Sequence, residues 1–174
     1  MLKRLWFIAL PVLVSCQAIR EANQKADLAY FPPVGSVWVL EKKLVAPGRS
    51  MNLLIIDGKV HDSYFLWNRY KPACSLDFMN PNRDETTIRP TRFVITKVER
   101  NTETIDTTTG NFMTIMHVTS ADNARIKSIT CQGWNSYDPE PYVSIAEMRE
   151  ATRGILRLEI KGQSEAGQNK GMSD

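Results

Sequence analysis

The feature that most limits how this chain can fold is a series of short segments in which apolar and polar residues alternate or β-branched residues gather. The segments cover residues 36–45, 52–56, 60–67, 74–78, 92–98, 112–118, 126–132 and 156–160. Each has the length of one strand. A single short helix is expected near the C-terminus, where Ser144 and Glu147 have the spacing of a capping box. The pattern predicts a mainly β fold, a small antiparallel sandwich or barrel of about seven or eight strands.

Turn-forming residues stand between several of these segments. Asp57 and Gly58 separate two apolar runs and favour a type I′ hairpin, because both central residues of that turn need positive φ. Pro47 and Gly48 predict a second turn. The threonine-rich residues 102–110 predict a long hairpin loop. These turns all favour antiparallel connections between neighbouring strands.

The first fifteen residues have the layout of a cleaved secretory leader. Lys3 and Arg4 precede an apolar run over residues 5–14, and Ser15 follows it. A hydrocarbon core needs about 20 residues, so a permanent membrane helix is the weaker interpretation of this short run. We therefore expect residues 1–15 to be a signal peptide that is removed.

The tetrapeptide Leu13-Val14-Ser15-Cys16 resembles the bacterial lipobox. The resemblance implies that the Cys16 thiol carries a lipid, that the leader is cut before this cysteine, and that the new amino terminus is acylated. Two or more acyl chains anchor a protein stably, at about 0.8 kcal/mol per buried methylene. The residue after the cysteine is Gln17 and not an aspartate. In this the chain resembles lipoproteins that are sent to the periplasmic side of the outer membrane. The alternative is an ordinary secretory leader followed by a chance cysteine.

The net charge gives no reason to expect a polyanionic partner. Removing Lys3 and Arg4 with the leader leaves 20 basic residues against 19 acidic ones, a net charge of about +1. Because the chain has no basic cluster, electrostatics do not favour nucleic acid or a polybasic membrane patch. The membrane contact expected here is through the lipid anchor.

Two cysteines remain once Cys16 is assigned to the lipid. Cys74 shares a strand face with Leu76, and Cys131 shares one with Ile129, so both are expected to point inward. An even pair in an oxidising compartment favours a disulfide, which would stabilise the fold by roughly 4 kcal/mol. A redox or metal pair is the alternative, but no C-x-x-C spacing occurs.

The chain is expected to divide into four parts. After the leader, residues 16–35 form the lipidated N-terminus and a tether, residues 36–161 the β-rich domain, and residues 162–174 a disordered tail. As flexible coil, the tether would have an end-to-end distance of roughly 24 Å. Residues 18–29 could instead form a short helix.

Patterns that would indicate catalysis are few. No nucleophile elbow, Walker loop, H-E-x-x-H or dinucleotide fingerprint occurs. His61 and Asp62 are neighbours, but adjacent strand residues point to opposite faces and cannot form a direct acid–base pair. His117 is expected to be a hydrogen-bonded or half-exposed strand histidine. We therefore expect no catalytic residues, no metal and no cofactor, in a protein that is not an enzyme.

Aromatic side chains gather near both paired cysteines. They are Tyr64, Phe65, Trp67 and Tyr70 before Cys74, and Trp134, Tyr137 and Tyr142 after Cys131. A bridge would bring the two groups to one end of the domain, with Trp67 near Trp134. One interpretation is that they pack around the disulfide. The other is a patch that binds a protein or a glycan, because aromatic residues and arginine are enriched at hot spots. Its candidate residues are Arg69, Trp134, Tyr137 and Tyr142.

Three motifs resemble a group of proteobacterial envelope lipoproteins of similar length. They are Tyr70-Lys71-Pro72-Ala73-Cys74-Ser75-Leu76, Ile88-Arg89-Pro90 leading into Phe93-Val94-Ile95, and Ile129-Thr130-Cys131-Gln132. The likeness spans about residues 35–135. It implies paired cysteines and an envelope location. The group has no assigned function, so no site residue is carried over from it.

Three functional hypotheses follow. The first is a non-enzymatic outer-membrane lipoprotein whose β-domain binds another envelope component, either a protein or a glycan. The second is an accessory or structural subunit of a larger membrane assembly. The third is an enzyme that acts on the cell wall with carboxylates brought together by folding. A stoichiometric complex after gentle solubilisation would favour the second hypothesis over the first.

Overall fold

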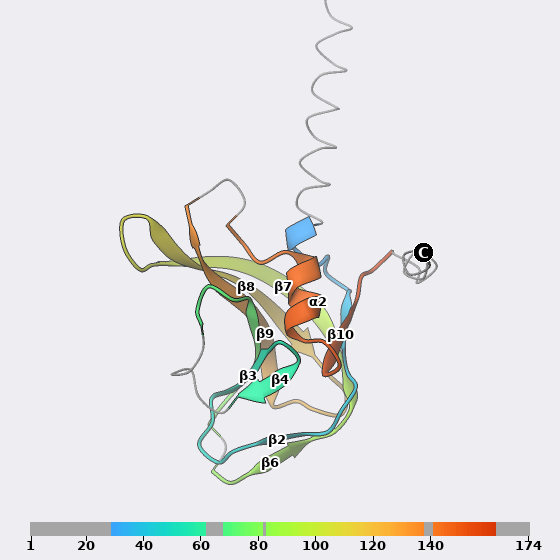
Figure 1. Cartoon of the computed structure of the whole chain (residues 1–174). Helices are drawn as coiled ribbons and strands as arrows, with labels where there is room; N and C mark the ends of the chain where they lie inside the picture. Colours follow the sequence, from blue (N-terminus) through green and yellow to red (C-terminus); the bar gives the residue numbers. More distant parts are fainter. Residues whose placement is uncertain (1–28, 62–67, 82, 138–140, 163–174) are drawn as a thin grey trace, which may run out of the picture.

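The computed structural model describes residues 29–61, 68–81, 83–137 and 141–162, which fold around one large antiparallel sheet (Figure 1). The sheet has eight strands and curls into a half-barrel, with a small second sheet of two strands. A short helix near the C-terminus, α2 (Ile145–Ala151), completes it. These features confirm the predicted mainly β class. Among the described residues, no helix has the length and hydropathy needed to cross a bilayer.

The main sheet brings together strands from both ends of the chain. Its members are β1 (Val37–Leu40), β3 (Asn52–Ile56), β4 (Lys59–His61), β5 (Ala73–Phe78), β7 (Thr91–Thr104), β8 (Thr109–Thr119), β9 (Ile126–Ser136) and β10 (Leu156–Glu159). Their order in space is β10-β1-β7-β8-β9-β5-β3-β4. The second sheet pairs β2 (Leu44–Ala46) with β6 (Thr86–Ile88). The first strand therefore lies between the last strand and β7.

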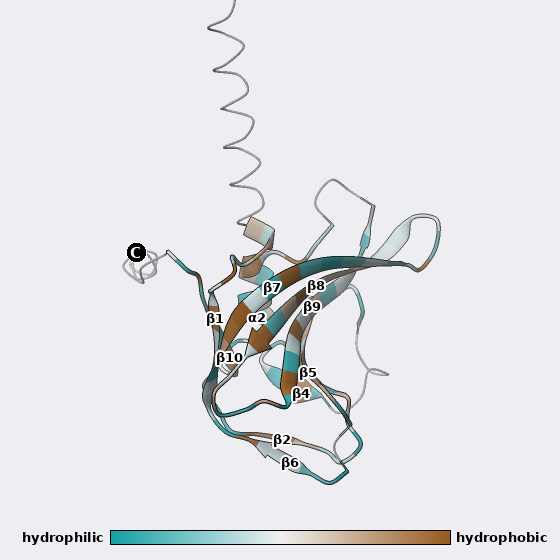
Figure 2. Cartoon of the chain, turned by 180° about the vertical axis from the view of Figure 1, so that it is seen from behind, coloured by the Kyte–Doolittle hydropathy of each residue, from teal (hydrophilic) through white to brown (hydrophobic). Residues whose placement is uncertain are grey.

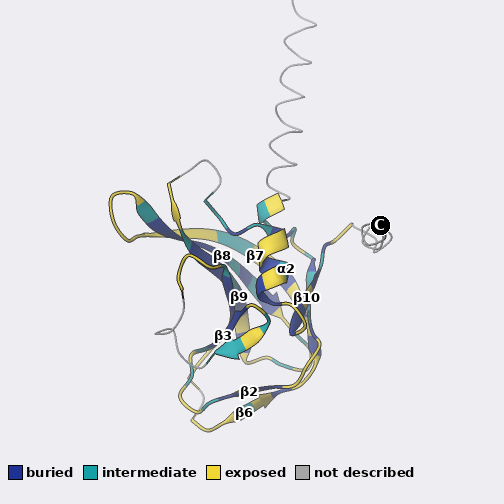
Figure 3. Ribbon diagram, in the orientation of Figure 1, coloured by how far each residue is buried: buried dark blue, intermediate teal, exposed yellow. Residues whose placement is uncertain are grey.

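The main hydrophobic core fills the concave side of the half-barrel. Trp38 of β1 is fully buried, and its indole nitrogen donates to the Met116 sulfur of β8 at 3.3 Å. Ile145, Met148 and Ala151 of α2 belong to the same core. Because α2 contacts both β5 and β10, which stand five places apart in the strand order, the sheet curls around the helix. Figure 3 shows the buried strand interiors and the exposed outer side of α2.

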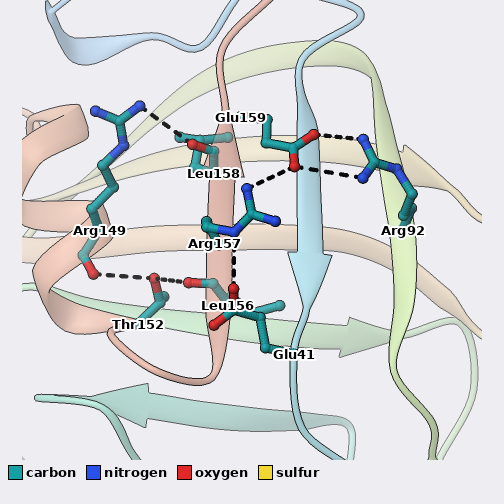
Figure 4. A network of polar contacts seen from close by, with 8 residues as sticks. All are labelled: Glu41, Arg92, Arg149, Thr152, Leu156, Arg157, Leu158 and Glu159. Carbon is teal, nitrogen blue, oxygen red and sulfur yellow. Dashed lines mark hydrogen bonds and ion pairs between the residues drawn. The ribbon is translucent and has the colours of Figure 1, made fainter. Parts of the chain in front are cut away.

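Both ends of α2 are fixed by side-chain hydrogen bonds. The predicted capping box is confirmed, since the Glu147 amide donates to the Ser144 hydroxyl and the Ser144 amide donates to the Glu147 carboxylate. After the helix, the buried Thr152 hydroxyl lies 2.9 Å from the Met148 carbonyl oxygen and 3.1 Å from that of Leu156. The Thr152 contact to Leu156 ties the helix to the start of β10 (Figure 4).

The hairpin between β3 and β4 also confirms its predicted turn. Asp57 and Gly58 have φ values of 48° and 70°, as a type I′ turn requires. Gly58 is needed for a second reason, because a Cβ at this position would lie 2.5 Å from the Arg153 carbonyl oxygen. The Gly58 amide donates to the Ala151 carbonyl at 2.9 Å. The turn therefore docks on the C-terminal end of α2.

The segment 36–45, predicted as one strand, is divided between the two sheets. Trp38 and Leu40 point into the core from β1, and Leu44 points inward from β2. A continuous strand would place Lys42 on the same inward face, because side chains alternate with a period of two. Lys42 is exposed, so the chain leaves the main sheet before it. Burying an unpaired ammonium group would cost more than the interrupted strand.

The β7–β8 hairpin is longer than the sequence pattern predicts. Residues 102–110 were expected as a loop, but β7 continues to Thr104 and β8 begins at Thr109. At the tip, the Asp106 carboxylate accepts hydrogen bonds from Thr108 and Thr109, which hold the Asp106 pKa below its usual value. Threonine suits a strand because its β carbon is branched. Figure 2 shows this end of the hairpin as mostly polar.

Ion pairs link the convex side of β10, β1 and β7 (Figure 4). Arg157 contacts Glu41 at 2.8 Å and Glu159 at 2.7 Å, and Arg92 binds the other Glu159 oxygen at 2.5 Å. The hydrogen bond from Arg92 is the largest of the causes that lower the Glu159 pKa. Exposed pairs of this kind contribute about 1 kcal/mol or less each. They fix the register of an edge strand rather than form a pocket.

Candidate functional site: two aromatic clusters on one arm

Three strands of the main sheet continue beyond their neighbours. β1 pairs with β7 only over Thr91–Val94, whereas β7 and β8 remain paired out to Thr104. β9 pairs with β8 out to Ser136 but with β5 only as far as Gln132. We call this three-stranded end the arm. Its concave face continues the core side of the half-barrel, and its convex face is the opposite one.

The concave face of the arm carries what we call the inner cluster: Phe31, Arg100, Phe112, Tyr137 and Tyr142. The Phe112 ring centroid lies 5.4 Å from that of Tyr137 and 5.5 Å from that of Tyr142, both edge-on. Phe31 lies 5.3 Å from Tyr142, and the Arg100 guanidinium carbon lies 3.6 Å from the Phe31 centroid. Edge-to-face and cation–π contacts of this kind add stability beyond burial.

Threonine hydroxyls of β7 hold the two phenols of this cluster. The Tyr137 hydroxyl donates to Thr104 at 3.0 Å, and the Tyr142 hydroxyl lies 3.2 Å from that of Thr102. Phe112 is buried, whereas Tyr137 is 48% exposed. The inner cluster therefore has a closed side toward the core and an open side toward the end of the arm.

The convex face carries what we call the outer cluster: Arg69, Tyr70 and Trp134. The Arg69 guanidinium carbon lies 5.0 Å from the Trp134 ring centroid. The Tyr70 ring meets the same indole edge-on, with centroids 6.0 Å apart and planes at 78°. Tyr70 is 67% exposed, so the outer cluster presents an aromatic ring to solvent.

Backbone and side-chain contacts hold the loop that carries Arg69 and Tyr70. The Trp134 amide donates to the Arg69 carbonyl at 2.8 Å, which places the loop beside the end of β9. Within the loop, the Lys71 amide donates to the Asn68 carbonyl at 2.9 Å. The Lys71 ammonium bonds Asp57 at 2.8 Å, and this hydrogen bond lowers the Asp57 pKa. The outer cluster is therefore preformed.

The four predicted patch residues lie in two pairs. Arg69 and Trp134 belong to the outer cluster, and Tyr137 and Tyr142 belong to the inner cluster on the other face of β9. Trp67, expected near Trp134, lies outside the described residues. Tyr70 was among the aromatic residues expected near Cys74, but not among the four candidate residues of the patch. The sequence interpretation did not include Phe31, Arg100 and Phe112. If the predicted strand over residues 126–132 is extended, its side chains continue to alternate between the two faces. Trp134 and Tyr137 then point to opposite faces.

Cys74 and Cys131 form the predicted disulfide. They lie directly opposite one another on β5 and β9, and both are fully buried in the core. The bridge is on the concave face of β9, whereas Trp134 is on the convex face. The outer cluster therefore does not pack around the bridge, which was one interpretation of these aromatics.

A half-buried carboxylate lies on the convex face between β5 and β9. Asp77 accepts hydrogen bonds from the hydroxyls of Thr130 at 2.5 Å, Ser75 at 2.7 Å and Ser128 at 3.0 Å. Burial raises the Asp77 pKa, and these three hydrogen bonds act in the opposite direction with a smaller combined effect. The folded state therefore binds this proton more tightly than the unfolded chain does.

The raised Asp77 pKa has a consequence for stability. Protonated Asp77 stabilises the folded state. This stabilisation is fully present below the pKa of Asp77 in the unfolded chain, about 3.9, and is lost as the pH rises through its pKa in the folded protein. Asp77→Asn keeps the shape and an oxygen acceptor but cannot titrate. We expect urea unfolding to show Asp77→Asn gaining stability relative to the natural protein as the pH rises from about 4 toward neutrality.

A second variant controls for the loss of one negative charge. Asp84→Asn removes the same charge at an exposed position. Comparing each variant with the natural protein at every pH cancels the contributions of the other carboxylates. A stability difference for Asp77→Asn that stays constant, or that shrinks as the pH rises, would contradict the assignment.

His117 lies in a surface ion group on the convex face of β7 and β8. Its Nε2 atom is 2.7 Å from Glu99, whose other oxygen bonds Lys97. The His117 side chain is 40% exposed, so the predicted half-exposed, hydrogen-bonded histidine is confirmed. The Lys97 and His117 hydrogen bonds lower the Glu99 pKa. In the described part of the chain, no three His, Cys, Asp or Glu side chains gather as metal ligands would.

Comparisons with protein-family models, curated proteins and solved structures find no match to this chain. What the arm can do therefore follows from its own chemistry. The outer cluster offers an exposed phenol and a guanidinium beside a half-buried indole. The inner cluster offers apolar ring area that opens at Tyr137. Both suit the recognition of another surface.

Proposed function

We propose that this protein is a lipid-anchored envelope protein, held at the periplasmic side of the outer membrane, whose half-barrel binds another envelope protein. The lipobox-like sequence ending at Cys16 supports the anchor. The Cys74–Cys131 disulfide supports an oxidising compartment, where such bonds persist. The binding surface we propose is the outer cluster.

The observation that carries this proposal is the exposed Tyr70 ring on a preformed base. Arginine, tyrosine and tryptophan are the residue types most enriched at protein hot spots. Arg69, Tyr70 and Trp134 bring one of each together. Their loop is already held by the bond between Trp134 and Arg69, so little conformational entropy is lost when a partner binds. An ordered, exposed aromatic group of this kind can supply a large share of a binding free energy.

A protein fits the outer cluster better than a glycan does. Sugar rings bind tryptophan by stacking on an open indole face, but the Arg69 guanidinium already covers one face of Trp134. The Tyr70 ring also meets the indole edge-on. The groups left for a partner are the Arg69 donors and the exposed Tyr70 ring, which suit carbonyl, carboxylate and apolar groups of a polypeptide.

A photo-crosslinking residue at position 70 tests the proposal in intact cells. We expect one defined adduct with an envelope protein, which is then purified and its affinity measured. Tyr70→Ala should weaken that affinity by at least about tenfold, as loss of a hot spot does. The same variant should change the free energy of unfolding by no more than about 0.5 kcal/mol, because Tyr70 is a surface residue.

Tyr137 provides the matched control for Tyr70. It is also an exposed tyrosine, but it lies in the inner cluster on the other face of β9. Tyr137→Ala should leave the affinity for the crosslinked protein unchanged. Equal loss in both variants, or crosslinks at position 70 to cell-wall glycan instead of protein, would overturn the proposed binding surface.

A further inference from the structure

The described part of the chain begins beside the inner cluster. The Tyr30 ring lies 6.3 Å from that of Phe31, which packs on Tyr142. The Gly35 amide then donates to the Ile95 carbonyl at 2.8 Å, so this segment runs along β7 before β1 begins. Contacts with the domain therefore start before residue 36, the expected domain boundary. Figure 1 shows this beginning at the same end of the half-barrel as the arm, away from β2 and β6.

The distance from Cys16 limits which surface of the domain can reach a membrane. Cys16 and Ala29 are 13 positions apart. A connection of this length spans at most about 45 Å when fully extended, and roughly 20 Å as flexible coil. The end of the domain nearest to Ala29 is therefore the end that a lipid on Cys16 would keep closest to the bilayer on average.

The two ends of the half-barrel differ in chemistry. The arm end carries the tyrosines of the inner cluster and, at the hairpin tip, Ile105, which is 41% exposed between the exposed Glu103 and Asp106. The opposite end carries exposed charged side chains in its loops, namely Lys42, Lys43, Arg49, Arg83, Asp84, Glu85 and Arg125. Tyrosine is enriched where one end of its ring meets lipid and the other meets water. Among the described residues, the loops of the opposite end (41–51, 79–90 and 120–125) carry no aromatic side chain.

We propose that the arm rests on the phospholipid headgroup interface, with Tyr137 and Ile105 as its lipid contacts. The proposal depends on the anchor at Cys16 in the proposed function. The contact orients the domain so that β2 and β6 point away from the membrane. It also leaves the outer cluster, on the convex face of the arm, beside the membrane surface and open to a partner embedded in it.

Methyl resonances of the full lipidated chain test this orientation. The protein is placed in vesicles of phosphatidylethanolamine and phosphatidylglycerol that contain a lipid with a gadolinium headgroup. We expect the gadolinium to broaden the Ile105 methyl signal until it is lost. The Ile105→Val variant, which lacks this signal, assigns it. The exposed Met51 and Met79, which precede β3 and follow β5 at the opposite end, should keep their methyl signals. Signals lost at Met51 and Met79 but kept at Ile105 would overturn the proposal, as would equal loss.

A pair of variants separates the contact from the anchor. Tyr137→Asp places a charge in the proposed lipid contact and should restore part of the Ile105 signal while vesicle sedimentation stays complete. Val45→Asp is the matched control, at a half-exposed position on β2, and should leave the Ile105 loss unchanged. Protein that does not sediment with vesicles would refute the anchor and, with it, this proposal. Protein that sediments with an intact Ile105 signal would refute the orientation alone.

Discussion

Replacing Cys74 and Cys131 together by alanine is expected to lower the free energy of unfolding by about 4 kcal/mol. The bridge closes a loop with a sequence separation of 57 residues, which contains all of β7 and β8 and the first half of β9. Cutting it restores to the unfolded chain the conformations that the loop excludes. Both positions are fully buried, so lost sulfur contacts add to the effect. Thermal unfolding should move down by roughly 10 to 20 °C.

Urea unfolding of the alanine pair and of the reduced natural protein measures this effect. Thr114→Val is the matched control, since Thr114 lies directly opposite Cys131 on β8 and is also fully buried. Among the described residues, the Thr114 hydroxyl has no hydrogen-bond partner, so valine should not lower the stability. A loss below about 1 kcal/mol in the alanine pair, or free thiols at both cysteines in protein isolated without reductant, would contradict the bridge's stabilising role.

Cys16→Ser is expected to remove the protein from the outer-membrane fraction. Serine has no thiol to carry a lipid, and each acyl chain contributes about 0.8 kcal/mol per buried methylene to membrane binding. The leader should also stay uncut by the peptidase that acts before a lipidated cysteine. Fractionation and intact-mass measurement of the mature protein record both results.

The Cys74→Ala/Cys131→Ala variant serves as the control for Cys16→Ser. It keeps Cys16 and should remain in the membrane fraction even though its domain is less stable. If Cys16→Ser still matures at the same residue and sediments with membranes, lipidation is not the anchor.

Local chemistry made much of the fold predictable. Asp57 and Gly58 fix their hairpin because few residue pairs accept positive φ at both positions. Ser144 fixes the start of α2, because its hydroxyl accepts a hydrogen bond from the Glu147 amide, which has no acceptor within the helix. The alternation around Cys74 and Cys131 placed both on the inward face. Each of these features depends on residues within a few positions of one another.

The arm could not be predicted in the same way, because its contacts join distant parts of the chain. Phe31 and Arg100 meet although they are far apart in sequence, and no local pattern links them. Trp134 and Tyr137 are close in sequence but lie on opposite faces, because β9 continues to Ser136. The sequence shows why the first predicted strand is interrupted, because a continuous strand would place the charged Lys42 on the inward face. It does not show that the following residues pair with β6, because that pairing depends on where β6 lies in the fold.

The strand order has a consequence for when this protein can finish folding. Val37 of β1 pairs with Val94 on one side and with Glu159 on the other, 57 and 122 positions along the chain. In contrast, β7, β8 and β9 follow one another as hairpins, whose loops close at a small entropic cost. The hairpins can form early, but the strand nearest to the amino terminus has to wait for its last partner. A chain with this order completes its main sheet only after β10 is available to pair with β1.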